Sequence, residues 1–174
     1  DRRGRDGGRM TATLRLTDGT TTVDLLTSGA LALAKGGLSL PPPPLQPTWG
    51  GANAMRDGAD LVDRRYDNRT VLMRLEIQGA SHDALIANIQ ALNSILRTAM
   101  DTQRYGWGTE VHLEYKWTDA TKTTYFDVLS GSLQMPEDLM SKWLDQGTLK
   151  TVREAVLTLT CRPFAHGLLS DSHE

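Results

Sequence analysis

Histidine and cysteine are the side chains best suited to chemistry, because they bind transition metals and serve as bases or nucleophiles. The candidate ligands are His82, His112, His166 and Cys161. No two of them have a ligand spacing such as i, i+2 on a strand or i, i+4 on a helix, so the spacing predicts no metal site. Cys161 ends an apolar segment beside Arg162, which is typical of a buried structural thiol. We therefore expect neither a metal nor a cofactor.

Glu110, His112 and Glu114 alternate along one predicted strand and share its polar face. An acid, an imidazole base and a second carboxylate could together serve a hydrolase. An alternating charged face is, however, the usual solvent-exposed face of an amphipathic strand. We therefore expect no catalytic residues and no enzymatic activity.

Aromatic residues are the remaining candidates for ligand binding. Tyr105 and Trp107 lie in an expected turn, whereas Tyr115 and Trp117 lie on the apolar face of a predicted strand. Core packing is the expected role of the strand pair. The turn pair could stack on sugar rings, so a carbohydrate-binding β-sandwich module of an extracellular or baseplate protein is an alternative function.

The elements that would position these residues are organised around the segment from Arg69 to Asp101. Apolar residues alternate from Val71 to Ile77, which is the period of a half-buried strand. Ser81 can then cap a long helix. Its apolar stripe consists of Leu85, Ile86, Ile89, Leu92, Ile95, Leu96, Ala99 and Met100. A helix with such a stripe needs a sheet to cover.

Strands are predicted on both sides of this unit, and Asp18-Gly19 is a hairpin signal between the first two. We expect strands at Thr11–Leu16, Thr20–Leu26, Leu31–Leu33 before Gly36-Gly37, Val111–Trp117, Thr123–Ser130 and Thr148–Cys161, the last with a bulge or bend near Glu154, and a short helix after Pro136. The predicted fold is mainly β (α+β): an antiparallel β-sandwich with one flanking α-helix and an extended Pro-rich arm.

The arm is the segment from Leu38 to Asp60, where regular patterns stop. Pro41, Pro42, Pro43 and Pro44 must be extended and cannot belong to a central strand. Leu45, Trp49 and Met55 follow, so the segment is not a purely polar linker. We interpret it as an extended loop that places apolar side chains on another surface, its own or that of a neighbouring subunit.

At 174 residues the chain suits one domain, residues 10–174, preceded by an N-terminal arm at residues 1–9. That arm is polar, rich in glycine and basic through Arg2, Arg3 and Arg5; it either contacts a neighbouring subunit or folds back on its own domain. A net charge of -2 gives no general attraction to nucleic acid or anionic lipid. No apolar run spans a bilayer and no signal peptide is recognisable. The single cysteine suits synthesis in a reducing compartment.

Two stretches resemble tail proteins of long-tailed, siphovirus-like bacteriophages. The first is DGADLVDRRYDNRTVLMRLEIQGASHDALIANIQALNSIL, residues 57–96, in which an Arg-flanked strand and a Gly-Ala-Ser link lead to the helix. The second is VLTLTCRPFAHG, residues 156–167, which is similar to the final strand of the distal-tail type, although Arg162 stands where that type has an acidic residue. The resemblance covers about two thirds of the chain.

This resemblance implies a non-enzymatic structural virion protein. It implies hexameric rings around a DNA-conducting channel, either in the tail tube or in the distal-tail ring, in contact with other tail proteins and made in the host cytoplasm. DNA would pass without specific binding, which suits the mildly acidic chain. The candidate residues for subunit contacts are Arg2, Arg3, Arg5, Pro41, Pro42, Pro43, Pro44, Leu45, Trp49 and Met55.

Overall fold

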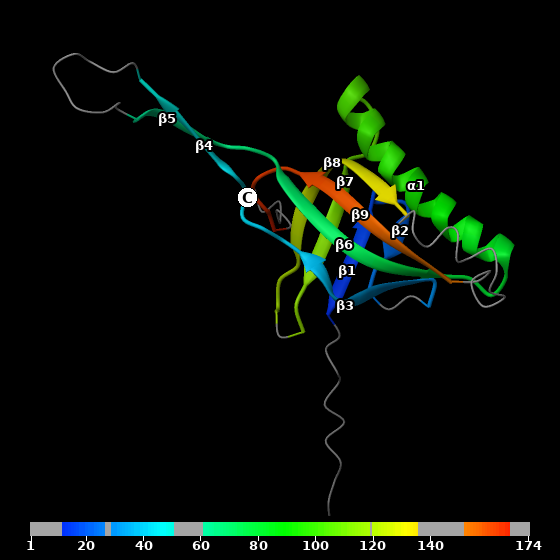
Figure 1. The fold of residues 1–174 in the computed structure, drawn as a ribbon. Coiled ribbons are helices and arrows are strands. Elements are labelled where there is room, and N and C mark those ends of the chain that lie inside the picture. Colours follow the sequence, from blue (N-terminus) through cyan, green and yellow to red (C-terminus); the bar gives the residue numbers. More distant parts are fainter. Residues whose placement is uncertain (1–11, 27–28, 51–60, 119, 136–151, 168–174) are drawn as a thin grey trace, which may run out of the picture.

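One long helix lies against a seven-stranded antiparallel sheet, and a separate two-stranded hairpin projects away from both (Figure 1). The structure is a computed structural model that describes residues 12–26, 29–50, 61–118, 120–135 and 152–167. In chain order its elements are β1 (Thr13–Thr17), β2 (Thr22–Asp24), β3 (Leu31–Ser39), β4 (Leu45–Trp49), β5 (Leu61–Tyr66), β6 (Arg69–Gln78), α1 (His82–Tyr105), β7 (Val111–Lys116), β8 (Thr124–Gln134) and β9 (Val152–Cys161). The described chain is therefore mainly β with one helix, as the sequence predicts.

The predicted sandwich of two packed sheets is replaced by one sheet. Its strand order is β2-β1-β7-β8-β9-β6-β3, so β2 and β3 form its edges and the sheet is not closed. The helix α1 lies chiefly against β8 and also contacts β6 and β7. Because α1 covers the apolar face, the second apolar layer that a sheet requires is supplied by a helix instead of a second sheet.

Strands β6 and β9 carry the centre of the core and pair without interruption from Arg69↔Cys161 to Gln78↔Val152. The bulge that we expected near Glu154 is therefore absent from this pair. The buried residues of β9, Ala155 to Cys161, alternate on one face throughout. Val152 and Val156 belong to the opposite, half-exposed face, so the apparent change of face in the sequence reflects two valines outside the core.

The helix begins where its sequence predicts and runs past Asp101, the expected limit of this unit, to Tyr105. Ser81 caps it, with its Oγ accepting a hydrogen bond from the Ala84 N–H at 3.2 Å. Gly106 ends it in a left-handed conformation and donates its N–H to the Thr102 carbonyl at 3.0 Å. The predicted stripe is buried, except that Ile86 is half-buried and Met100 is exposed. Asn88 Nδ2 donates to the Gln78 carbonyl at 2.6 Å and ties the helix to the end of β6.

The first hairpin is confirmed, but the strand that follows it is longer than expected. Asp18 Oδ1 accepts the N–H groups of Thr20 and Thr21 in the turn between β1 and β2. Strand β3 continues through Gly36-Gly37 to Ser39, with a register shift between Leu33 and Leu38. A side chain at Gly37 would meet backbone oxygens of β3 and β6, which explains why glycine permits the irregularity.

Gly79 provides a test of how tightly α1 is joined to β6. A Cβ at this position would lie 2.3 Å from the Leu85 backbone nitrogen, so the start of the helix would have to move. We expect Gly79→Ala to lower the free energy of unfolding by about 1–3 kcal/mol, measured by urea denaturation. Gly167→Ala is the matched control, since nothing lies within 4 Å of that Cβ. Equal stability of the two variants would contradict this packing.

Two predicted segments lie outside the described residues: the N-terminal arm at residues 1–9 and the short helix after Pro136. In the described part of the chain, no helix combines the length and apolar character needed to cross a membrane.

Candidate functional site

The segment from Leu38 to Asp60, predicted as an extended arm without regular structure, contributes to a β-hairpin. Strands β4 and β5 pair antiparallel from Leu45↔Tyr66 to Trp49↔Leu61, with a register shift after Thr48. Pro41 to Pro44 have no helical or strand structure, as their fixed φ angles predict. We call the segment from Leu45 to Tyr66 the hairpin arm; in Figure 1 its strands extend well beyond the sheet.

Every described residue of β4 and β5 is exposed. Alternation along β4 places Leu45, Pro47 and Trp49 on one face and Gln46 and Thr48 on the other. Among the eleven exposed large hydrophobic side chains that the structure describes, five belong to the hairpin arm: Leu45, Trp49, Leu61, Val62 and Tyr66. The arm therefore concentrates apolar surface away from the core.

The two ends of the arm are joined to each other at its base, and the arm contacts the body there. The Asp67 N–H donates to the Pro44 carbonyl at 2.8 Å, which closes the two ends of the hairpin. The Tyr66 ring packs edge-on against Phe164, with 5.1 Å between the ring centroids. Phe164 follows β9 and belongs to the stretch of residues 156–167, so this stretch also contacts the arm.

The structure therefore places some of the predicted contact residues together and leaves others undescribed. Leu45 and Trp49 lie exposed on β4, and the four prolines lead from β3 into it. Met55, Arg2, Arg3 and Arg5 lie outside the described residues. The sequence missed the contribution of Leu61, Val62 and Tyr66, because we took the arm to end at Asp60.

The aromatic pair expected in a turn lies at the C-terminal end of α1, with Tyr105 as its last residue, and both side chains are exposed. The rings of Tyr105 and Trp107 lie 5.9 Å apart and are tilted by 30°. The Arg104 guanidinium lies 5.3 Å from the Tyr105 ring centroid. Of the strand pair that we expected to pack in the core, Tyr115 packs partly against it, whereas Trp117 is exposed because β7 ends at Lys116.

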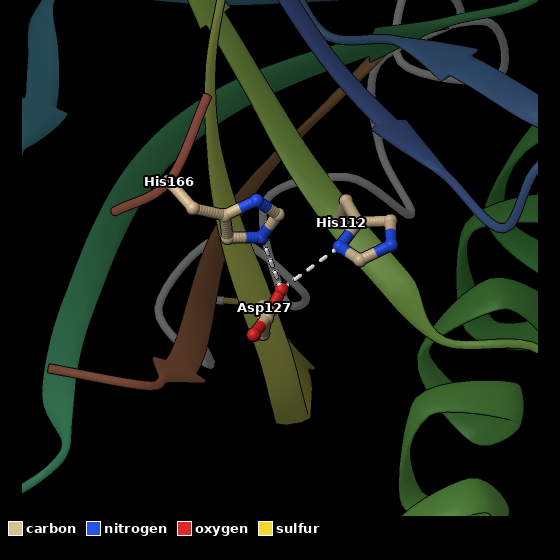
Figure 2. Close-up of side chains that lie close together, drawn as sticks. All are labelled: His112, Asp127 and His166. Carbon is tan, nitrogen blue, oxygen red and sulfur yellow. Dashed lines mark hydrogen bonds and ion pairs between the residues drawn. The ribbon is translucent and has the colours of Figure 1, made fainter. Parts of the chain in front are cut away.

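A second cluster lies on the polar face of β7 and β8, where His112, Asp127 and His166 meet (Figure 2). His112 and Asp127 are cross-strand partners, and His112 Nδ1 lies 3.0 Å from Asp127 Oδ1. His166 Nε2 lies 2.6 Å from the same oxygen. His166 is held there by a two-way backbone pairing with Tyr125, whose ring also stacks on the imidazole.

Three basic side chains, those of His112, His166 and Arg162, contact the Asp127 carboxylate. The Arg162 Nε lies 3.5 Å from Asp127 Oδ2, so the two carboxylate oxygens face different partners. Partial burial alone would raise the pKa of Asp127, but the hydrogen bonds and positive charges of His166 and His112 lower it overall. The hydrogen bond to Asp127 raises the pKa of His166, against a smaller opposing effect of burial.

We expect the raised pKa of His166 to depend on Asp127. Because folding raises this pKa, the contact stabilises the fold below the ordinary pKa of about 6.5 and is lost as the pH rises through the raised value. In EDTA-treated protein, an NMR pH titration of the imidazole should show the His166 midpoint falling in Asp127→Asn. Asp101→Asn, which breaks the distant ion pair with Arg97, should leave it unchanged. The same midpoint in Asp127→Asn as in the parent would contradict this.

The linear spacing of the histidines did not reveal this cluster. His112 and Asp127 are 15 residues apart, and His166 is 39 residues from Asp127. The signal was the expected hairpin of Val111–Trp117 and Thr123–Ser130, whose register brings His112 opposite Asp127. Of the three residues considered together in the sequence, His112 contacts Asp127, and Glu114 is the cross-strand partner of Tyr125. Cys161 is buried, and burial raises the pKa of its thiol to about 12, as suits a structural residue.

The fold is similar to part of two chains of known structure. A chain in the structure of the phage p2 baseplate in its activated conformation with Sr is similar with a TM-score of 0.56 and 14% identity, over 86% of this chain and 43% of that chain. A chain of the same baseplate with Ca gives a TM-score of 0.50 and 17% identity, over 86% and 44%. This protein thus spans less than half the length of those chains. Its sequence matches no protein-family profile and no curated protein.

Proposed function

We propose that this protein is a structural component of a phage tail, at or near the baseplate, and that the hairpin arm joins it to neighbouring subunits. The similarity in fold to chains of the phage p2 baseplate supports the general role. The observation that carries the assembly role is the group of five large apolar side chains exposed on the arm. Exposed apolar surface concentrated in this way is typical of interaction sites.

Physical chemistry favours a partner for the arm. A two-stranded hairpin is marginally stable in water unless it packs against another surface. Burying one large apolar side chain contributes about 1.5–3 kcal/mol, so a subunit that covered Leu45, Trp49 and Leu61 would stabilise both the hairpin and the assembly. Pro41 to Pro44 restrict the backbone angles of the segment that leads into the arm. This reduces the conformational entropy lost when the arm docks.

The finer form of the proposal is a hexameric ring around a DNA channel, in the tail tube or in the distal ring, in contact with other tail proteins. The role is not enzymatic, and DNA passes through without specific contacts. The net charge of -2 supports passage over binding, because retention of DNA would require phosphate contacts from lysine and arginine. The protein spans less than half the length of each baseplate chain, so the ring and the neighbouring tail proteins are proposed for it and are not inferred from the whole of those chains.

The experiment is to measure the mass of the purified protein by light scattering across a range of concentrations and to image the same samples by negative stain. We expect rings or short tubes with about six subunits around. A monomer at every concentration would contradict self-assembly. Mixing with other tail proteins would then show whether the arm binds a different subunit.

A second candidate is a carbohydrate-binding module, favoured by the exposed pair of Tyr105 and Trp107. Such a protein should show a change in tryptophan fluorescence with oligosaccharides. The change should be lost in Trp107→Phe and kept in Trp117→Phe, whose indole is also exposed. The absence of any change across a panel of glycans would remove this candidate.

A further inference from the structure

Two imidazoles and one carboxylate from three separate segments converge on the polar face of the sheet, at His112 of β7, Asp127 of β8 and His166 after β9. We propose that these three residues bind one divalent transition-metal ion of the zinc class. One nitrogen of each imidazole and one carboxylate oxygen lie within 4.8 Å of one another. The site does not involve the hairpin arm, so a test of metal binding and a test of assembly can fail independently.

The contacts of His166 support the binding of a cation here. His166 Nδ1 lies 3.2 Å from the Gly167 carbonyl, which can only accept, so the two form a hydrogen bond in the tautomer that carries its proton on Nδ1. In the neutral imidazole, Nε2 is then a lone-pair nitrogen that faces the Asp127 carboxylate at 2.6 Å. Two acceptors repel each other at this distance, so the contact needs a positive charge. In the metal-free protein a second proton on the imidazole supplies it, and a metal ion that replaced this proton would hold the two ligand atoms further apart.

The Gly167 contact is also the support that a metal-bound imidazole normally has. A ligating histidine usually donates its second ring N–H to a carbonyl or carboxylate, which fixes the tautomer and the ring orientation. The backbone pairing of His166 with Tyr125, at 2.8 and 2.9 Å, fixes the segment as well. The ligand nitrogen of His166 is therefore aimed at the site before any ion binds.

The distances allow an ion with a small adjustment. Zinc–nitrogen and zinc–oxygen bonds of about 2.0–2.1 Å in a tetrahedron place ligand atoms about 3.4 Å apart. Both imidazoles now point at one oxygen of Asp127, so the ion would enter between them as the carboxylate withdraws slightly. His166 is the most exposed of the three side chains and can make this adjustment. The remaining coordination position would hold water, as in open zinc sites.

The ligand chemistry selects the class of metal. Two imidazoles and one carboxylate suit zinc, cobalt, nickel or copper, whereas calcium takes six to eight oxygen ligands. Arg162 contacts the other carboxylate oxygen at 3.5 Å and keeps Oδ1 directed at the imidazoles, although its charge weakens the binding of a cation. Glu110 adds negative charge close to His166. A bound ion would join the segment after β9 to the β7–β8 hairpin.

The test uses the full chain, treated with a chelator and dialysed, and titrated with zinc chloride by calorimetry. We expect one zinc ion per chain, with affinity reduced about tenfold or more in His166→Gln and in Asp127→Asn. His82→Gln is the matched control and should bind zinc as the parent does, since this histidine opens α1 and lies outside the cluster. Cobalt(II) should give the visible absorption of a tetrahedral site, and this signal should disappear in His166→Gln.

Three results would overturn the proposal. They are the absence of zinc binding by the parent, undiminished binding by both His166→Gln and Asp127→Asn, and displacement of zinc by calcium in modest excess. Circular dichroism of each variant confirms folding, and a folded His166→Gln that loses zinc, beside a folded His82→Gln that keeps it, supports the site. The half-exposed position of His166 makes its substitution compatible with the fold.

Discussion

A variant in which the hairpin arm, residues 45–66, is replaced by Asn-Gly is expected to fold and to remain monomeric. The Asp67 N–H already donates to the Pro44 carbonyl at 2.8 Å, so a two-residue turn inserted between them keeps a bond that β-turns normally make. The sheet and α1 lose no core residue, because every residue of β4 and β5 is exposed. Light scattering should report a single chain where the parent forms rings.

Deletion of residues 41–51 alone would be a poorer test of the arm. Such a deletion would take away β4 and leave β5 without its partner strand. A misfolded product could then be mistaken for a loss of assembly. The Asn-Gly variant removes both strands together. Its circular dichroism spectrum and its midpoint of thermal unfolding should be close to those of the parent. Rings formed by this folded variant would contradict the role of the arm.

A matched pair of tryptophans tests the arm with single substitutions. Trp49 on the arm and Trp117 after β7 are 60% and 58% exposed, so the same change removes a similar amount of exposed surface from each. We expect Trp49→Ser to weaken assembly by about 2 kcal/mol or more, as for an aromatic anchor at an interface. Trp117→Ser should leave the assembly intact. Equal effects would place the interface elsewhere.

The second large effect is expected in the core, where Leu92→Ala should lower the free energy of unfolding by about 3–4 kcal/mol. Leu92 is 0% exposed in the middle of α1 and belongs to the single cluster of buried apolar residues. The substitution removes apolar contacts and leaves a cavity that the helix and the sheet can only partly fill. Urea denaturation of the parent and the variant gives the difference directly.

Leu72→Ala is the control for this prediction, because it makes the same chemical change on the outer face of β6. Leu72 is 43% exposed, so its truncation creates no enclosed cavity and should cost about 0.5 kcal/mol or less. The comparison separates the cavity term from the loss of three carbon atoms. Similar losses in the two variants would mean that α1 does not close the core as described.

Local sequence patterns were sufficient to predict the strand and the helix that each bury one face. The alternation from Val71 to Ile77 and the helical stripe from Leu85 to Ala99 match the buried residues. The Asp18-Gly19 turn and the Ser81 cap are likewise where the sequence predicts them. These features depend on residues close in the chain, and backbone geometry relates such residues directly to one face or one turn.

Features that depend on pairing between distant strands were not accessible in this way. Alternation shows that a strand has an apolar face, but it does not show whether a helix or a second sheet covers that face, and the sandwich prediction was wrong for this reason. The pairing of β4 with β5 and the meeting of His112, Asp127 and His166 depend on register across long separations. That register is selected because it buries all the apolar faces at once. No single local segment of the chain carries this information.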